Sequence, residues 1–144
     1  MYVESFVLTV DPAEVRSGSV ILGEALDGGF RISAIPSEVR FGALLELALD
    51  PEDGPGAYEV EILLEYARLD GAPQVPIDEP FTIHAVETSP DWWGPRLVHQ
   101  PLAISLRFWH EFEGYLVVRI NGEEEGEKAL RAIHVELPDA VGEL

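Results

Sequence analysis

Hydrophobic and polar residues alternate with a period of two along several stretches of the chain, which is the pattern of a strand with one buried face. The alternation is clearest in residues 39–50 and 58–66. Residues 50–56, rich in Asp, Pro and Gly, connect these two stretches. We therefore expect the two strands to pair as an antiparallel hairpin.

Shorter runs of the same kind predict further strands in residues 6–10, 81–87, 102–108, 112–120 and 131–137. In the last of these runs, the alternation places Ile133, Val135 and Leu137 on the inner face. Between the last two runs stands Asn121-Gly122, which is among the strongest short signals for a hairpin turn.

Roughly six to eight short strands at even spacing, without a convincing amphipathic helix, predict an all-β fold. We expect a single domain over residues 1–144. Its architecture is predicted to be an antiparallel β-sandwich of Greek-key or immunoglobulin-like type. A small β-barrel is the alternative.

The composition fits this fold class and narrows the range of partners. Hydrophobic residues make up 47% of the 144 residues, which is enough for one buried core. The 27 acidic residues outnumber the 9 basic ones, so the net charge is -18. Such a charge disfavours nucleic acid and anionic membranes as partners, and it favours solubility or binding to a basic protein.

Two absences bear on the environment of the chain. Cysteine does not occur, so disulfides and thiolate chemistry are excluded. The N-terminal stretch MYVESFVLTV lacks the basic start of a signal peptide, and no apolar run approaches the roughly 18 residues of a membrane-spanning helix. We expect a soluble, cytoplasmic protein.

Several local features occur together: AEVRSGSVILG in residues 13–23, Ile35-Pro36 before the first long strand, Asp70-Gly71 after the second, and a late hairpin from Phe112-Glu-Gly-Tyr115 to Asn121-Gly122. In this combination the chain resembles a family of uncharacterised bacterial proteins, a domain of unknown function. The resemblance implies a compact β-sandwich. That family has no assigned activity, so no functional residue is implied.

Few residues point to catalysis or metal binding. The four histidines lack the close spacing of zinc ligands, and neither a nucleophile elbow nor a phosphate-binding glycine loop occurs. Asp50, Glu52 and Asp53 crowd one loop and are weak candidates for a cation site, although the alternating order of a calcium loop is missing. Such residues also simply favour turns. We expect no catalytic residue, no metal and no cofactor.

Aromatic residues are the best candidates for ligand binding. Trp92 and Trp93 stand together in a proline-bracketed loop with Arg96 nearby, and large aromatic residues are typical anchors of binding surfaces. Because neighbours in an extended loop point to opposite sides, we expect one of the two rings to be buried and the other exposed. Trp109 has the opposite parity to Phe108, so we expect it to be exposed too, unless a bulge re-aims it.

These observations favour a non-catalytic module that binds another protein or a second copy of itself. Two alternatives stay open. A carbohydrate-binding module would use exposed tryptophans as stacking platforms. A small enzyme would use a carboxylate site that no sequence motif reveals.

Overall fold

The computed structural model describes residues 1–11, 14–16, 19–21, 26, 29–66, 74–77, 79–85 and 94–135. These residues form strands and turns, and they contain no helix that is long and apolar enough to cross a membrane. The strands are β1 (Tyr2–Thr9), β2 (Glu14–Arg16), β3 (Ser19–Ile21), β4 (Gly29–Ile32), β5 (Ser37–Leu49), β6 (Gly56–Tyr66), β7 (Gln74–Pro76), β8 (Phe81–Ala85), β9 (Arg96–Phe108), β10 (Phe112–Ile120) and β11 (Glu123–His134).

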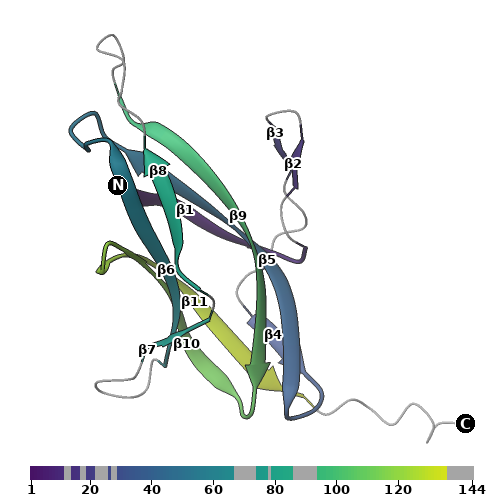
Figure 1. Cartoon of the computed structure of the whole chain (residues 1–144). Coiled ribbons are helices and arrows are strands. Elements are labelled where there is room, and N and C mark those ends of the chain that lie inside the picture. The colour runs from purple at the N-terminus through teal and green to yellow at the C-terminus, as the bar shows by residue number, and fades with distance from the viewer. Residues whose placement is uncertain are drawn as a thin grey trace, which may run out of the picture.

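Two sheets pack against each other, which confirms the predicted all-β sandwich (Figure 1). One sheet has three strands in the order β1-β5-β9. The other has six, in the order β4-β11-β10-β6, with β7 and β8 both paired to the outer edge of β6. Neither sheet closes into a barrel within the described residues, and the pairing of β4 with β11 is parallel, so the sandwich is not purely antiparallel.

The hydrophobic core lies between the two sheets. Phe41, Leu45 and Leu47 of β5 are buried, and so are Leu116 and Val118 of β10. All five belong to one cluster of buried side chains. Burial of each such side chain stabilises the fold by about 1.5–3 kcal/mol. The inward-facing apolar side chains of the two sheets therefore hold the sheets together.

The hairpin predicted between residues 39–50 and 58–66 is wrong. β5 pairs with β1 and β9, whereas β6 pairs with β10, β7 and β8, so the chain crosses from one sheet to the other between them. Alternation shows that each strand has one inner face, but it does not show which strand lies beside it. The loop at residues 50–55 is long enough to cross the roughly 10 Å between two packed sheets.

The strand predicted at residues 131–137 is longer than expected and faces the other way. Leu130 and Ala132 of β11 are buried, whereas Ile133 and Val135 are 37% and 36% exposed. The prediction that Ile133 and Val135 face inward is therefore wrong. Leu137, the third residue of that prediction, lies outside the described residues.

Hydrophobicity within residues 131–137 indicates one facing, but a β-bulge earlier in β11 fixes the opposite one. β10 and β11 change register between Val118 and Arg119, where Glu125 is an extra residue on β11. Because side chains alternate with a period of two, one inserted residue moves every later side chain of the strand to the opposite face. With the bulge in place, Leu130 and Ala132 pair with Gly114 and Phe112 and share their inner face.

The hairpin turn between β10 and β11 is the one predicted from the sequence. Asn121 and Gly122 have φ angles of 50° and 83°, as a two-residue type I′ turn requires. The backbone N–H of Asn121 donates to the carbonyl oxygen of Glu59 at 2.8 Å, and its side-chain Oδ1 accepts from the N–H of Glu59 at 2.9 Å. These two bonds join the tip of the hairpin to β6.

The sandwich is tightly closed at one edge. Gly126 follows the bulge of β11, and a Cβ at this position would lie 3.1 Å from the Cβ of Val3 on β1. β1 also changes register between Val3 and Ser5. The bulges and the glycine therefore let the edge strand of the three-stranded sheet approach β11 closely.

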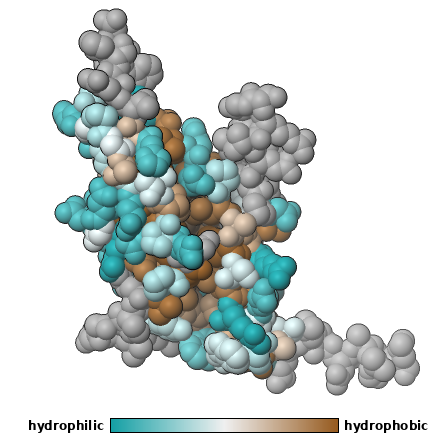
Figure 2. All heavy atoms as spheres, in the orientation of Figure 1, coloured by the Kyte–Doolittle hydropathy of each residue, from teal (hydrophilic) through white to brown (hydrophobic). Residues whose placement is uncertain are grey.

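The opposite edge of the sandwich is open. There β9 lies across from β7 and β8, and Figure 2 shows hydrophobic side chains gathered at the surface in the middle of this view. We refer to the hollow between these strands as the lateral groove. Its apolar lining residues are Ile62, Ile77, Phe81, Leu102, Ala103 and Ile104.

Gly114 lies where two strands and an aromatic ring meet. A Cβ at this position would overlap the carbonyl oxygen of Glu65 on β6 and would lie 2.6 Å from the ring of Phe112. That ring packs edge-on against Tyr66, with 4.8 Å between the ring centroids. Only glycine leaves room for the ring at this point of β10.

We expect Gly114→Ala to lower the free energy of unfolding by about 1–3 kcal/mol or more, because the added methyl group overpacks a site bounded by backbone. Chemical denaturation monitored by circular dichroism measures the change. Gly54→Ala is the matched control, since a Cβ there has no atom within 4 Å. Equal free energies of unfolding for the two variants would show that the backbone of β6 and the ring of Phe112 shift to make room without loss of stability.

Candidate functional site

Arg96 and Trp109, the two predicted ligand-binding residues that the structure describes, lie far apart. Trp92 and Trp93 lie outside the described residues, so the expectation of one buried and one exposed ring stays a prediction. Arg96 is the first residue of β9, and Trp109 follows the last. At about 3.3 Å per residue these two positions are roughly 40 Å apart along the strand.

The weak cation candidates, Asp50, Glu52 and Asp53, lie in the loop between β5 and β6. Oδ2 of Asp53 accepts a hydrogen bond from the backbone N–H of Asp50 at 2.8 Å and lies 2.8 Å from the N-terminal amine. The hydrogen bond from this amine is the largest cause that lowers the pKa of Asp53. Among the described residues, no group of three or more His, Cys, Asp or Glu side chains is placed to hold a metal ion.

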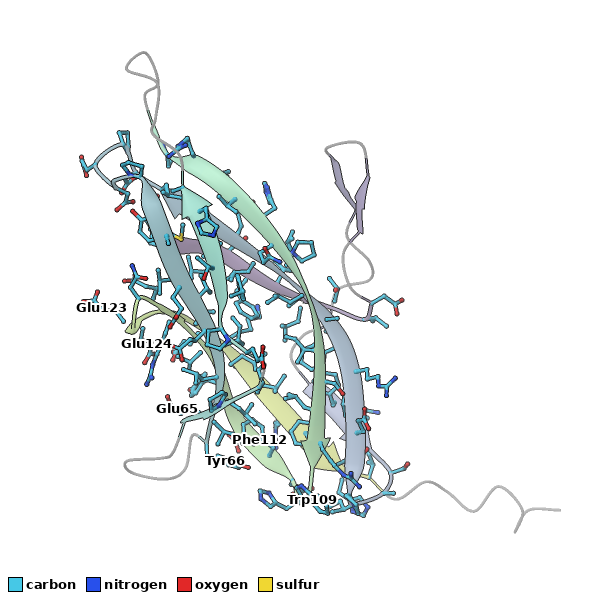
Figure 3. All side chains as sticks on the ribbon, in the orientation of Figure 1. Glu65, Tyr66, Trp109, Phe112, Glu123 and Glu124 are labelled. Carbon is cyan, nitrogen blue, oxygen red and sulfur yellow. The ribbon has the colours of Figure 1, made fainter. Side chains whose placement is uncertain are left out.

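Aromatic side chains gather at the end of the sandwich where β9 connects to β10 (Figure 3). We refer to Tyr66, Phe108, Trp109, His110 and Phe112 as the aromatic end. Ring centroids are 4.8 Å apart for Tyr66 and Phe112 and 5.7 Å apart for Phe108 and Phe112. The ring of His110 lies 5.9 Å from that of Tyr66. The contacts link β6, β9 and β10 at this end.

Trp109 projects from the aromatic end into solvent. Its side chain is 65% exposed, which confirms the exposure predicted from its parity. The guanidinium carbon of Arg107 lies 4.7 Å from the centroid of the indole. Such a cation–π contact is worth about 0.5–1 kcal/mol at an exposed site, and it orients both side chains relative to each other.

The short connection that carries Trp109 is tied to its neighbours. Nδ1 of His110 lies 2.7 Å from the carbonyl oxygen of Glu111. Oε1 of Glu111 accepts a hydrogen bond from the backbone N–H of His134, at the end of β11, at 2.9 Å. Together with the contact between His110 and Tyr66, these bonds restrain the connection.

Exposed apolar side chains occur mainly at the end of the sandwich that carries Trp109. Of the seven exposed large hydrophobic side chains among the described residues, four lie at this end of the sandwich. The other three members of this group are Ile35 at 41%, Ile133 at 37% and Val135 at 36% exposure. The pairing of Ser37 with Phe108 places the segment before β5 beside the segment after β9, so Ile35 lies close to the aromatic end.

Charge is divided unevenly between the two sheets. The strands of the three-stranded sheet carry three carboxylates and three arginines, which are Glu4, Glu38, Glu46, Arg40, Arg96 and Arg107. The six-stranded sheet carries eight carboxylates and four basic side chains, which are Glu59, Glu61, Glu65, Glu113, Glu123, Glu124, Glu125, Glu127, Arg31, Arg119, Lys128 and Arg131. The negative charge of the described strands therefore belongs to the six-stranded sheet.

Two hollows near these features are small. One beside the aromatic end, lined in part by Tyr66, Phe112 and Arg131, has a volume of about 160 Å³. The lateral groove measures about 230 Å³. Pockets that enclose small molecules usually measure roughly 300–1,000 Å³. This geometry suits contact across a surface better than enclosure of a small molecule.

The parity of the strand predicts the exposure of Trp109, but it does not predict that Tyr66 and Phe112 lie at the same end of the sandwich. Tyr66 reaches this end because it is the register partner of Gly114 across β6 and β10. Pairing of this kind cannot be deduced from one sequence. The segment from Trp109 to Phe112 did contain a local signal, because three of its four residues carry aromatic rings.

Comparison of the chain with models of known protein families, with curated proteins and with solved structures finds no match. The resemblance to a family of uncharacterised bacterial proteins therefore stays a prediction. Function has to be argued from the residues of this chain.

We expect Asp53→Asn to make stability less dependent on pH in the acid range. Because the folded pKa lies below the unfolded value of about 3.9, the carboxylate stabilises the fold above that value and loses this contribution as the pH falls through the folded pKa. Urea midpoints of wild type and variant, measured from about pH 7 down to about pH 3, should converge as the pH falls.

Glu52→Gln is the control for this titration, because Glu52 is an exposed carboxylate of the same loop. We expect its midpoints to follow those of the wild type over the whole range. A constant difference between wild type and Asp53→Asn down to the lowest pH would show that the carboxylate of Asp53 does not stabilise the loop through its charge.

Proposed function

We propose that the protein is a non-catalytic module that binds another protein through its aromatic end. The observation that carries this proposal is Trp109, a tryptophan that is 65% exposed on a restrained connection, with Arg107 against its ring. Tryptophan and arginine are enriched among the residues that contribute most to protein–protein affinity. Covering such an indole in a complex removes a large apolar surface from water.

The surroundings of Trp109 support a protein as the ligand. Ile35, Ile133 and Val135 are exposed at the same end of the sandwich, and the charged side chains of Arg131 and Glu113 line the hollow beside Tyr66 and Phe112. An apolar centre with a polar rim is the usual anatomy of a protein–protein interface. A sugar platform would instead need hydrogen-bonding side chains ranged along an open ring face.

The charge of the chain indicates the kind of partner. A net charge of -18 attracts a basic protein over a distance of about one Debye length, roughly 8 Å at physiological salt. The aromatic end supplies the short-range contacts. We infer a partner with a basic surface that carries an apolar pocket or patch for the indole, whose association rate falls as salt is added.

The small hollows support a non-catalytic role. A catalytic site requires a concave pocket in which several polar groups converge on a reacting atom. Glu111 lines the hollow beside the aromatic end, but its Oε1 is bonded to the backbone of His134. This bond holds the connection between β9 and β10 against the end of β11.

Trp109→Ala is expected to weaken binding of the partner by about tenfold or more, the loss typical of a tryptophan anchor. Immobilised wild type, Trp109→Ala and Leu97→Ala are each exposed to a lysate of the source organism, and retained proteins are compared by quantitative mass spectrometry. Leu97 is the matched control, because it is a 49% exposed apolar residue near the opposite end of β9.

A protein retained by the wild type and by Leu97→Ala, but lost with Trp109→Ala, is the expected result. Equal retention by all three chains contradicts the role of Trp109. A glycan array run with the same chains separates the competing possibility, because glycan binding that disappears with Trp109→Ala would identify the aromatic end as a carbohydrate site instead.

A further inference from the structure

β9 is a long strand at the edge of a sheet. In the described ranges it pairs with β5 along all of its 13 residues, and with no other strand. An edge strand directs a row of backbone N–H and C=O groups away from its sheet, where they can pair with a further strand. Natural edge strands are usually protected against such pairing. The unprotected residues of β9 therefore indicate where a further strand can bind.

Pro101 shows which backbone groups of β9 point outward. A proline fits into a ladder only where its nitrogen faces away from the neighbouring strand, so Pro101 and Leu44 form a pair without hydrogen bonds between them. In antiparallel pairing such pairs alternate with hydrogen-bonded ones. Ala103, Ser105 and Arg107 have the same parity as Pro101, so their N–H and C=O groups also point to the free edge.

The protection of this edge is local. Pro101 has no N–H, and its carbonyl oxygen accepts a hydrogen bond from the side-chain Nε2 of Gln100 at 3.2 Å. Pairing is therefore blocked at Pro101. Beyond it, residues 102–108 continue as regular strand and offer the outward groups of Ala103, Ser105 and Arg107.

The charge pattern indicates what can lie against this segment. Two copies of a chain with a charge of -18 repel each other wherever their carboxylates approach. The sequence of β9, RLVHQPLAISLRF, has no carboxylate at all, and the three-stranded sheet to which it belongs has equal numbers of acidic and basic side chains. β9 itself thus brings no carboxylate to such a contact. Of the two carboxylates beside this segment, Glu38 accepts a hydrogen bond from Ser105 at 2.9 Å and is paired with Arg40, and Glu79 lines the lateral groove.

We propose that two copies of the chain form a dimer by antiparallel pairing of residues 102–108 of β9. With the two-fold axis at Ser105, Ala103 lies opposite Arg107 of the partner subunit, and no two like charges stand opposite each other. The three-stranded sheets then join into one continuous sheet. Because the pairing uses the same edge in both copies, assembly stops at the dimer.

The lateral groove adds an apolar component to this seam. Leu102 and Ile104 lie on the seam segment and line the groove together with Ile62 of β6. A second β9 beside the first covers the open side of the sandwich there, so apolar surface is removed from water in addition to the backbone hydrogen bonds formed. The seam uses backbone groups of β9 and does not depend on the function proposed for the aromatic end.

The mass of the native chain is measured by sedimentation equilibrium over a range of concentrations, together with three variants. Ala103→Pro removes one outward N–H from each copy and leaves the bonds to β5 in place, so we expect dimer affinity to fall by about tenfold or more. Pro101→Ala restores an outward N–H and lengthens the seam, so we expect tighter association. Ala103→Ser keeps the N–H and should associate like the native chain. Circular dichroism verifies that each variant folds.

Amide hydrogen exchange of the native chain tests the same seam without any substitution. The N–H groups of Ala103 and Ser105 should exchange slowly in concentrated solution and faster on dilution. This measurement decides the question if Ala103→Pro fails to fold. The proposal is overturned by the mass of a single chain at concentrations up to about 0.5 mM, or by a dimer in which Ala103→Pro associates like the native chain and exchange at these amides does not depend on concentration.

Discussion

Burial of one face of each sheet against the other is the interaction on which this structure depends. The strands alternate between apolar and polar side chains, so neither sheet can hide its apolar face alone. Leu45 on one sheet and Leu116 on the other are completely buried within one cluster. The chain must place complementary sheets on both sides of this core, which explains why β5 and β6 are neighbours in sequence but lie in different sheets.

Packing of the two sheets leaves two kinds of surface uncovered, which are the strand edges and the ends of the sandwich. One edge is closed by the approach of β1 to β11, and the other is open along β9. At one end the connection after β9 exposes Trp109. On these surfaces, backbone groups and apolar side chains stay available for binding after folding. The acidic side chains occupy the outer parts of the six-stranded sheet, where charge does not oppose burial.

The sequence allowed the strands and the fold class to be predicted, because period-two alternation depends only on neighbouring residues. It did not allow strand partners to be predicted, since β5 and β6 show the same pattern whether they form a hairpin or face each other across a core. The exposure of Trp109 followed from parity along a regular strand. The position of Tyr66 at the same end follows from the register between β6 and β10, for which the sequence holds no local signal.

The bulge at Glu125 has a consequence for how the chain tolerates change. The residue divides β11 into two parts. In the part before it, odd-numbered side chains lie on the inner face, and in the part after it, even-numbered side chains do. Replacement of its side chain leaves this alternation intact. Its deletion would turn Leu130 and Ala132 toward solvent and Ile133 toward the core, although no core side chain had been altered. The type of residue at this position can therefore change, but the residue cannot be deleted. Homologous chains should show substitutions there and no insertions or deletions.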